Sequence, residues 1–278
     1  MSTPTIGLAL GGGSARGLAH IPMLEVFDEL GLKPSVIAGC SIGALVGSAY
    51  AGGMSAAEIR ARAEMLLANR LTAMRYAFGE KRVSPFELVA MKGLASLHFQ
   101  GETLAGLVLP ETLPKLIEDL QIPFKVIATD FDMMEERVIE SGSLVKAIAA
   151  SIAIPGVILG PQYDGHTYVD GGVSNPVPFD HVRQGMDIVV AVDVTGRPRA
   201  ANGASRSNME LAVGSLFILF HQVAGLRRAM NPPDIYIRPA IDSFWGGDFF
   251  RIKEVLELAT TAKDQLKREL EKRINALG

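Results

Sequence analysis

The stretch Val36–Leu45, VIAGCSIGAL, holds the strongest local signal in the sequence, a G-x-S-x-G motif made by Gly39, Ser41 and Gly43. A short apolar run before the motif predicts a strand, and Ile42–Ala51 predicts a buried helix. A serine at such a junction sits on a sharp turn, and the two glycines keep neighbouring side chains away from its hydroxyl. The helix N-terminus beside it favours a developing negative charge. The context therefore predicts a nucleophile at Ser41, with a purely structural turn as the alternative.

Outward from this stretch, short apolar runs alternate with helical patterns along the chain. Strands are predicted at Thr5–Leu10, Val36–Ala38, Phe124–Phe131, Arg137–Glu140, Thr167–Asp170, Asp187–Val194 and Ile235–Arg238. Helices are predicted at Leu18–Leu30, Ile42–Ala51, Ser55–Arg70 with a capping box from Ser55 to Glu58, and Lys253–Ala276.

This alternation predicts an α/β fold in which parallel strands are covered by helices on both faces. Ligand sites in such sheets lie at the carboxyl ends of the strands. We therefore expect the chemistry in the loops after Leu10, Ala38 and Asp170.

Composition excludes several classes of protein. The 278 residues are 48% hydrophobic and 21% charged, which excludes a disordered chain. The balance of 27 basic against 30 acidic residues argues against a nucleic-acid binder. The single cysteine, Cys40, excludes an internal disulfide and a cysteine-rich metal site, and it reads as a small buried spacer in the motif.

Two uncharged stretches raise the question of a membrane span. Ser35–Ala57 is long enough but rich in glycine, so a strand, a tight turn and a buried helix explain it better. Leu211–Leu226 is shorter than a usual span and reads as a buried or partner-facing helix, with core packing favoured. No basic region precedes the first apolar run, so we expect no signal peptide and a cytoplasmic location.

The residue that would activate Ser41 is less obvious, because no histidine follows a strand end in a late loop. The histidines are His20, His98, His166, His181 and His221. Asp170 ends a predicted strand and precedes Gly171 and Gly172, which allow a close approach to another loop. A carboxylate can act as the general base directly. The residues alone leave a turn-capping role for Asp170 open, and Asp130 and Asp132 are rival bases that we rank lower.

A third feature is the glycine-rich loop Leu10–Gly17, which lies between a predicted strand and a helix. Successive glycines expose backbone N–H groups that can hold a phosphate or an oxyanion. The spacing matches neither the dinucleotide fingerprint nor the Walker A motif. An oxyanion hole for acyl transfer fits better.

Together these motifs resemble the patatin-like phospholipase family. The matching segments are Gly11-Gly12-Gly13 with Arg16-Gly17, Gly39–Gly43, Ala150–Pro155, Asp170-Gly171-Gly172 and Asn175–Pro178. Their order and spacing agree over about Thr5–Asp193, and no catalytic position departs from the family pattern. The resemblance implies a three-layer α/β/α sandwich with a mostly parallel central sheet.

The resemblance also implies a lipid acyl hydrolase of phospholipase A, lysophospholipase or carboxylesterase type. Ser41 would be the nucleophile and Asp170 its partner in a Ser-Asp dyad, with Gly171 and Gly172 supporting it. Gly12 and Gly13 of the Gly11–Gly13 loop would hold the oxyanion, and Arg16 would orient that loop. No metal or cofactor is expected, since the sequence has no evident calcium loop.

Two alternatives remain open at this stage. An acyltransferase or thioesterase would use the same dyad, although malonyl transacylases, which share the motif, pair their serine with a histidine. A non-catalytic regulator would keep the fold without turnover.

The remaining expectations concern organisation and partners. We expect a single domain over 1–278 with the motifs in 5–193, C-terminal helices at 208–230 and 253–276, and an insertion over 71–109 that is either an ordinary helical insertion or a lid. A lipid substrate implies transient contact with a membrane surface, and a homo-oligomer stays open. Candidate contact regions are the Leu211–Leu226 helix and the pairs Phe244-Trp245 and Phe249-Phe250, which we expect to be exposed.

Overall fold

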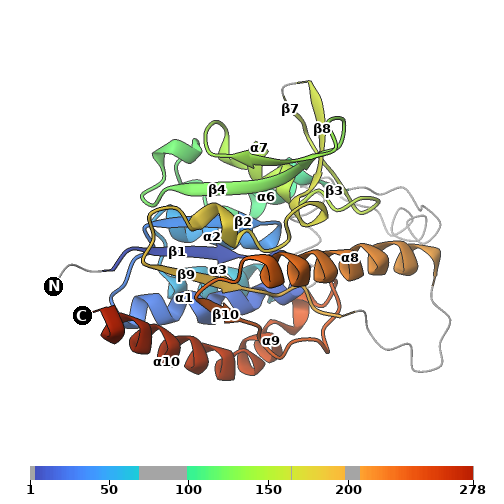
Figure 1. The fold of residues 1–278 in the computed structure, drawn as a ribbon. Coiled ribbons are helices and arrows are strands. Elements are labelled where there is room, and N and C mark those ends of the chain that lie inside the picture. The colour runs from blue at the N-terminus through green and yellow to red at the C-terminus, as the bar shows by residue number, and fades with distance from the viewer. Residues whose placement is uncertain (1–3, 69–98, 164, 198–206, 278) are drawn as a thin grey trace.

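The computed structural model describes residues 4–68, 99–163, 165–197 and 207–277, and a mixed β-sheet forms its centre (Figure 1). The parallel part has the spatial order β10-β9-β1-β2-β4, formed by β1 (Ile6–Leu10), β2 (Val36–Cys40), β4 (Phe124–Asp130), β9 (Ile188–Val192) and β10 (Ile235–Ile237). Antiparallel strands extend it beyond β4, namely β5 (Glu135–Ile139), β7 (Gln162–Tyr163) and β8 (His166–Asp170). A separate parallel pair joins β3 (Phe99–Gln100) to β6 (Ile158–Leu159).

Strands β2 and β8 share one edge of β4, because β5 occupies the other edge along 126–130. At the junction, Ile127 of β4 faces Cys40 at the end of β2, and Ala128 faces Asp170 at the end of β8. Since β2 runs parallel and β8 antiparallel to β4, their carboxyl ends point toward each other. The residue after Cys40 is therefore brought next to Asp170.

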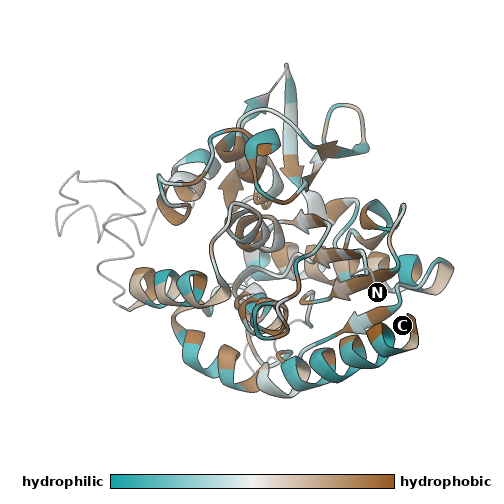
Figure 2. Ribbon diagram, turned by 90° about the vertical axis from the view of Figure 1, so that its left-hand side faces the viewer, coloured by the Kyte–Doolittle hydropathy of each residue, from teal (hydrophilic) through white to brown (hydrophobic). Residues whose placement is uncertain are grey.

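One face of the sheet packs into a large apolar core. Ile6, Leu8 and Leu10 of β1 point into it. The helices and 3-10 turns that contribute buried side chains to it are η1 (Ser14–Ala19), α1 (His20–Glu29), α2 (Ile42–Ala51), α3 (Ala56–Leu67), α6 (Gly101–Val108), η2 (Ile117–Asp119), α7 (Leu144–Ser151), α9 (Ile252–Leu258) and α10 (Thr260–Leu277). Figure 2 shows mainly hydrophobic strands at the centre and a more hydrophilic long helix along the lower edge.

The opposite face is lined by smaller residues, including Ala9, Ala38 and Ala191. They pack against the 3-10 turn η4 (Phe179–Val182) and the long helix α8 (Asn208–Met230). Small side chains let this layer approach closely, since a Cβ on Gly7 of β1 would lie 2.1 Å from a carbonyl oxygen of η4. The architecture is the α/β/α sandwich with a mostly parallel sheet that the sequence predicted.

Local signals placed most helix boundaries well. Ser55 and Glu58 form the predicted capping box at the start of α3. A second capping box, from Ser207 to Glu210, starts α8 and was not predicted. In place of one helix over 253–276, the structure has α9 and α10, which meet at Ala259.

Three expectations need correction or restriction. Residues 71–98 of the expected insertion lie outside the described residues, while Ala105 and Leu109 in its last part are buried in the core. Of the two aromatic pairs expected to be exposed, Phe244 is buried in the same core, Trp245 and Phe249 are half-buried, and Phe250 is exposed. Helix α8 is not core on all sides, since Ile218 and Leu219 are exposed.

No helix among the described ranges is long and apolar enough to span a bilayer.

Candidate active site

Ser41 occupies the junction between β2 and α2 with an unusual backbone conformation. Its φ of 54° and ψ of −123° lie in a region that non-glycine residues rarely adopt, which costs on the order of 1–3 kcal/mol. The flanking glycines make the turn possible. A Cβ on Gly39 would lie 2.5 Å from the Ala44 Cα, and one on Gly43 would lie 2.1 Å from the Leu10 carbonyl oxygen.

The Ser41 hydroxyl donates a 2.6 Å hydrogen bond to Oδ2 of Asp170. Oδ1 of Asp170 accepts the N–H of Gly172 at 2.8 Å, which fixes the carboxylate at the end of β8. Burial raises the pKa of Asp170 to about 6, although the bonds from Ser41 and Gly172 act against the rise. At neutral pH the group is therefore ionised yet close enough to its pKa to accept a proton.

Two further side chains hold these partners in place. Ser151, at the end of α7, accepts the Ser41 N–H at 2.8 Å and donates to the Ile127 carbonyl at 2.5 Å. Thr129 of β4 donates to the Asp170 carbonyl at 3.0 Å. Ser151 belongs to the Ala150–Pro155 segment quoted from the sequence, but the sequence assigned neither residue a role.

The glycine-rich loop after β1 lies against the turn Gly39–Gly43 between β2 and α2, which we call the elbow. A Cβ on Gly12 would sit 3.2 Å from the Ser41 Cβ. The N–H of Gly11 donates to the Val192 carbonyl at 3.0 Å, and the N–H of Gly12 donates to the Pro176 carbonyl at 2.9 Å. The expectation that Gly12 offers a free donor is therefore not met in this conformation. Within the described ranges, Gly13 is the glycine of this loop whose N–H has no partner.

The start of α2 supplies two other unengaged donors. The N–H groups of Ala44 and Leu45 bond to the Ser41 carbonyl and begin the helical ladder. Those of Ile42 and Gly43 precede the ladder and find no acceptor among residues that the structure describes. The N–H that follows a nucleophile contributes to the oxyanion hole of α/β hydrolases. Sequence reasoning missed this donor, although the motif itself signals it.

His20 lies beneath the glycine loop and is fully buried. Its Nε2 lies 2.8 Å from the Gly11 carbonyl oxygen. Burial lowers the pKa of His20 to about 4, so at neutral pH the ring is uncharged and Nε2–H donates to Gly11. The residue supports the loop and does not contact Ser41.

Arg16 also lies behind the loop, almost fully buried. Its Nη1 donates to the carbonyls of Phe244 at 3.1 Å and Arg197 at 3.3 Å, and the guanidinium lies 5.0 Å from the Phe217 ring centroid of α8. Burial lowers the pKa of Arg16 to about 10, so the side chain stays charged at neutral pH. This placement links η1 to α8.

The glycines after Asp170 permit close packing. A Cβ on Gly171 would lie 2.2 Å from the Ile127 carbonyl oxygen, and one on Gly172 would lie 2.5 Å from the Phe220 ring of α8. Any side chain at these two positions would push Asp170 away from β4 or from α8.

A charged network that the sequence did not reveal ties this loop to α8. The side-chain amide of Asn175 donates to Glu136 and Asp180, each at 2.9 Å. Arg227 of α8 pairs with Glu136 at 2.9 Å and Asp180 at 2.8 Å, and also donates to the Ser174 carbonyl at 3.2 Å. The network anchors the segment that follows Asp170.

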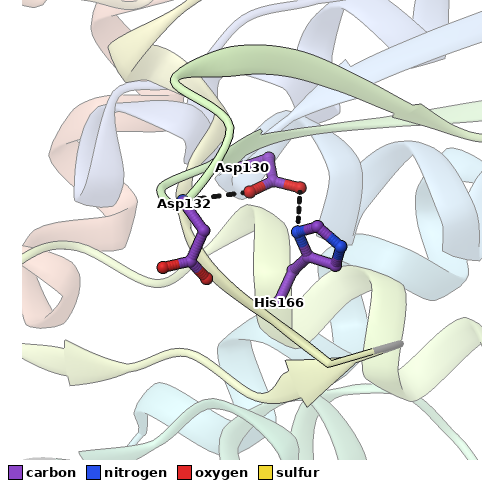
Figure 3. Close-up of side chains that lie close together, drawn as sticks. All are labelled: Asp130, Asp132 and His166. Atoms are coloured by element: carbon purple, nitrogen blue, oxygen red, sulfur yellow. Dashed lines mark hydrogen bonds and ion pairs between the residues drawn. The ribbon is translucent and has the colours of Figure 1, made fainter.

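The other candidate side chains make no hydrogen bond to Ser41 Oγ or to the Asp170 carboxylate among the described residues. Asp130 and Asp132, the rival bases, engage their own turn and His166 (Figure 3). His181 pairs with Glu136, and His221 lies 3.4 Å from the Thr195 hydroxyl. His98 lies outside the described residues. Cys40 is buried behind the elbow, and burial raises the pKa of its thiol.

Two groups of side chains have the spacing of metal ligands, Asp130 with Asp132 and His166, and Glu136 with Asp180 and His181. In both groups carboxylate oxygens already accept hydrogen bonds from backbone N–H groups or from neighbouring side chains. Both groups therefore stabilise the local structure through these hydrogen bonds in this conformation.

Comparison with known proteins gives consistent matches. The sequence model described as patatin-like phospholipase matches residues 8–183. Patatin-like phospholipase domain-containing protein 7 of Rattus norvegicus is 28% identical over 91% of this chain, and the chain spans 20% of that protein. An uncharacterised NTE family protein of Mycobacterium tuberculosis is 33% identical over 70% of this chain and 50% of its own length.

Among solved structures, VipD from Legionella pneumophila shares the fold with a TM-score of 0.51 at 14% identity. The alignment covers 96% of this chain and 67% of that one.

Proposed function

The chain belongs to the patatin-like phospholipase family, and from this premise we propose that it is a lipid acyl hydrolase with a Ser41–Asp170 dyad. The observation that carries the proposal is the 2.6 Å hydrogen bond from a hydroxyl on a strained elbow to a buried carboxylate. A buried carboxylate with a raised pKa is a suitable base for a serine that has no histidine partner.

In the proposed reaction, Ser41 Oγ attacks the ester carbonyl while Asp170 takes its proton. The tetrahedral oxyanion accepts hydrogen bonds from the N–H groups of Gly13 and Ile42, and the N-terminus of α2 adds favourable charge. Asp170 then protonates the leaving alcohol, which gives an acyl-serine. A water molecule, deprotonated by Asp170, then attacks the acyl-serine. As the fatty acid leaves, Asp170 returns that proton to Ser41 Oγ and restores the hydroxyl.

We further propose one catalytic domain for the residues of this chain. Support comes from the sheet, because β9 pairs with β1 and β10 pairs with β9. The later part of the chain thus belongs to the same sheet as the motifs. A lipid substrate also implies a surface that meets lipid aggregates.

The direct test is turnover by the purified protein on p-nitrophenyl acyl esters, phospholipids, lysophospholipids and acylglycerols. We expect release of free fatty acid that is lost in the Ser41→Ala protein. Addition of an alcohol or thiol acceptor shows whether acyl groups go to water or to the acceptor. A folded protein that turns over none of these esters would contradict the proposal.

A further inference from the structure

The turn between β4 and β5, residues 131–134, exposes three large apolar side chains. Phe131 is 64% exposed, Met133 56% and Met134 89%. Exposed apolar residues are common singly, but three in one turn call for an explanation. We call these residues the apolar turn.

The apolar turn projects from the edge of the sheet that carries the candidate dyad. Strand β4 is parallel to β2 and aligns Ile127 with Cys40, the residue before Ser41. It continues to Asp130 before it turns. At about 3.3 Å per residue, the turn lies about 10 Å beyond the level of the elbow. A surface that met the turn would also face the active-site edge.

Three of the four N–H groups of the apolar turn, those of Phe131, Asp132 and Met133, have hydrogen-bond partners. The N–H of Phe131 donates to the Thr167 carbonyl at 2.9 Å, and the N–H of Met133 donates to Asp130 Oδ1 at 3.0 Å. The N–H of Asp132 donates to the same Oδ1 at 3.0 Å (Figure 3). Asp132 Oδ2 in turn accepts the Thr167 N–H at 2.6 Å. A loop can enter hydrocarbon at low cost only when its polar backbone groups have partners. Asp130 is buried beneath the turn, whereas Asp132 is exposed within it and is held by the Thr167 N–H.

The charges around the apolar turn indicate which lipid headgroups it can approach. Asp132 and Glu135 are exposed acids within or beside the turn, and Asp130 lies below them with His166 at 3.0 Å. Arg137, also exposed, follows further along β5. Acids this close to the contact would be repelled by an anionic surface. The chemistry therefore favours zwitterionic headgroups.

The small size of the apolar turn argues against a protein as its binding partner. A stable protein interface buries about 800 Å² on each partner and involves about 20–30 residues a side. The apolar turn has four residues and protrudes, which suits insertion between lipids better than association with a second copy.

We propose that the apolar turn inserts into zwitterionic lipid surfaces and so brings the active-site edge to its substrate. This rests on the proposed lipid hydrolase function, but binding can be measured without turnover. The Ser41→Ala protein serves as the background, so a failure to bind and a failure to hydrolyse are separate results.

The first experiment places a reporter in the turn. In a Ser41→Ala, Trp245→Phe background, Phe131→Trp carries the single tryptophan of the chain. Phosphatidylcholine vesicles should shift its emission to the blue, and bromine-labelled acyl chains should quench it. The matched control, Met230→Trp, replaces a methionine that is 84% exposed at the far end of α8 and should show neither effect.

The second experiment removes the apolar side chains and measures vesicle cosedimentation. The double variant Met133→Ser, Met134→Ser should lower the partition coefficient about tenfold or more. Met134→Asn should lower it about threefold. Because Met134 has a φ of 57°, which asparagine adopts more readily, this variant should melt no lower than the parent. Met230→Ser should bind within twofold of the parent (about the scatter of such assays).

Four results would overturn the proposal. They are unchanged binding by the double variant, a blue shift at position 230 instead of 131, binding to phosphatidylserine vesicles alone, and a lipid-free dimer that the double variant abolishes.

Discussion

Two glycine-rich loops lie side by side at the carboxyl ends of β1 and β2, and they use glycine for different ends. In the first loop, the N–H groups of Gly11 and Gly12 donate to the carbonyls of Val192 in β9 and of Pro176. In the second, Gly39 and Gly43 leave space for the strained Ser41, and the N–H groups of Ile42 and Gly43 find no acceptor within the part of the chain that the structure describes. The loop after β1 is held in place by its hydrogen bonds, and the loop after β2 carries the candidate nucleophile.

This difference teaches that a run of glycines is not by itself an oxyanion hole. Of the three glycines after β1, only Gly13 keeps its N–H without a partner in the described structure. The second donor then comes from Ile42 at the start of α2, on the same loop as the nucleophile. In the proposed mechanism, the two loops each supply one donor to the oxyanion.

The largest expected effect follows from removal of the nucleophile. Ser41→Ala should lower kcat/KM for acyl esters by about 10⁴-fold or more, because no covalent intermediate can form. Steady-state kinetics with circular dichroism checks both turnover and fold. Ser48→Ala is the matched control, since Ser48 is a buried serine of α2 that donates only to the Leu45 carbonyl. Equal losses in both variants would assign the effect to folding.

The next effect separates Asp170 from its rival Asp130. Asp170→Asn keeps the shape of the side chain but cannot take the Ser41 proton, so kcat should fall about 10³-fold or more. Asp130→Asn disturbs the β4–β5 turn and the pair with His166 but no hydrogen bond of the dyad, and the same kinetic assay should find activity within about threefold of the parent. The reverse ranking would make Asp130 the base.

Alanine substitutions test the comparison of the two loops directly. A Cβ on Gly43 would meet the Leu10 carbonyl oxygen at 2.1 Å, so Gly43→Ala should prevent folding or abolish activity. A Cβ on Gly12 would meet the Ser41 Cβ at 3.2 Å and the Cys40 Sγ at 3.3 Å, contacts that small shifts can relieve. Gly12→Ala should therefore fold and lose about tenfold in kcat/KM. Thermal melting with kinetics distinguishes the two, and a fully active Gly43→Ala protein would refute the account of the elbow.

Acid should inhibit the enzyme, because protonated Asp170 cannot act as a base. With burial raising the pKa of Asp170 to about 6, kcat/KM should fall about tenfold from its plateau by pH 5. A pH–rate profile measures this, with protein stability followed at each pH. A flat profile from pH 5 to 8 would contradict the assignment.

The smallest expected effect concerns stability: Asp170→Asn, which should lower activity, should raise the free energy of unfolding. The folded state holds the Asp170 proton more tightly than the unfolded state, so ionisation between about pH 4 and 6 lowers the free energy of unfolding. Asp170→Asn removes that ionisation and should stabilise the protein at pH 8 by on the order of 1–3 kcal/mol. Urea denaturation checks it, and a less stable variant would contradict the burial argument.

The sequence predicted the sandwich fold and the elbow because both depend on local patterns. Apolar runs and glycine spacing placed β1, β2 and α2 within a few residues of their observed bounds. Ser41 could be proposed as the nucleophile from its own neighbourhood, and Asp170 as its partner through a family motif.

The remaining features depend on contacts between distant segments. The meeting of Cys40 and Asp170 along one edge of β4 requires the register of three strands. The bond from Gly12 to Pro176 joins loops far apart in the chain, and no local pattern shows it. Helix α8 was expected to be core, yet its burial depends on what covers each face, which hydrophobicity alone does not reveal.

The central claim is that Ser41 forms the covalent intermediate with Asp170 as its base. The most direct measurement is mass spectrometry of peptides from protein treated with a fluorophosphonate, with the wild type and the Asp170→Asn variant compared over time. We expect one adduct, on Ser41, that forms rapidly in the wild type and at least about 10²-fold more slowly in the variant. An adduct on another residue, or equal rates in the two proteins, would contradict the account.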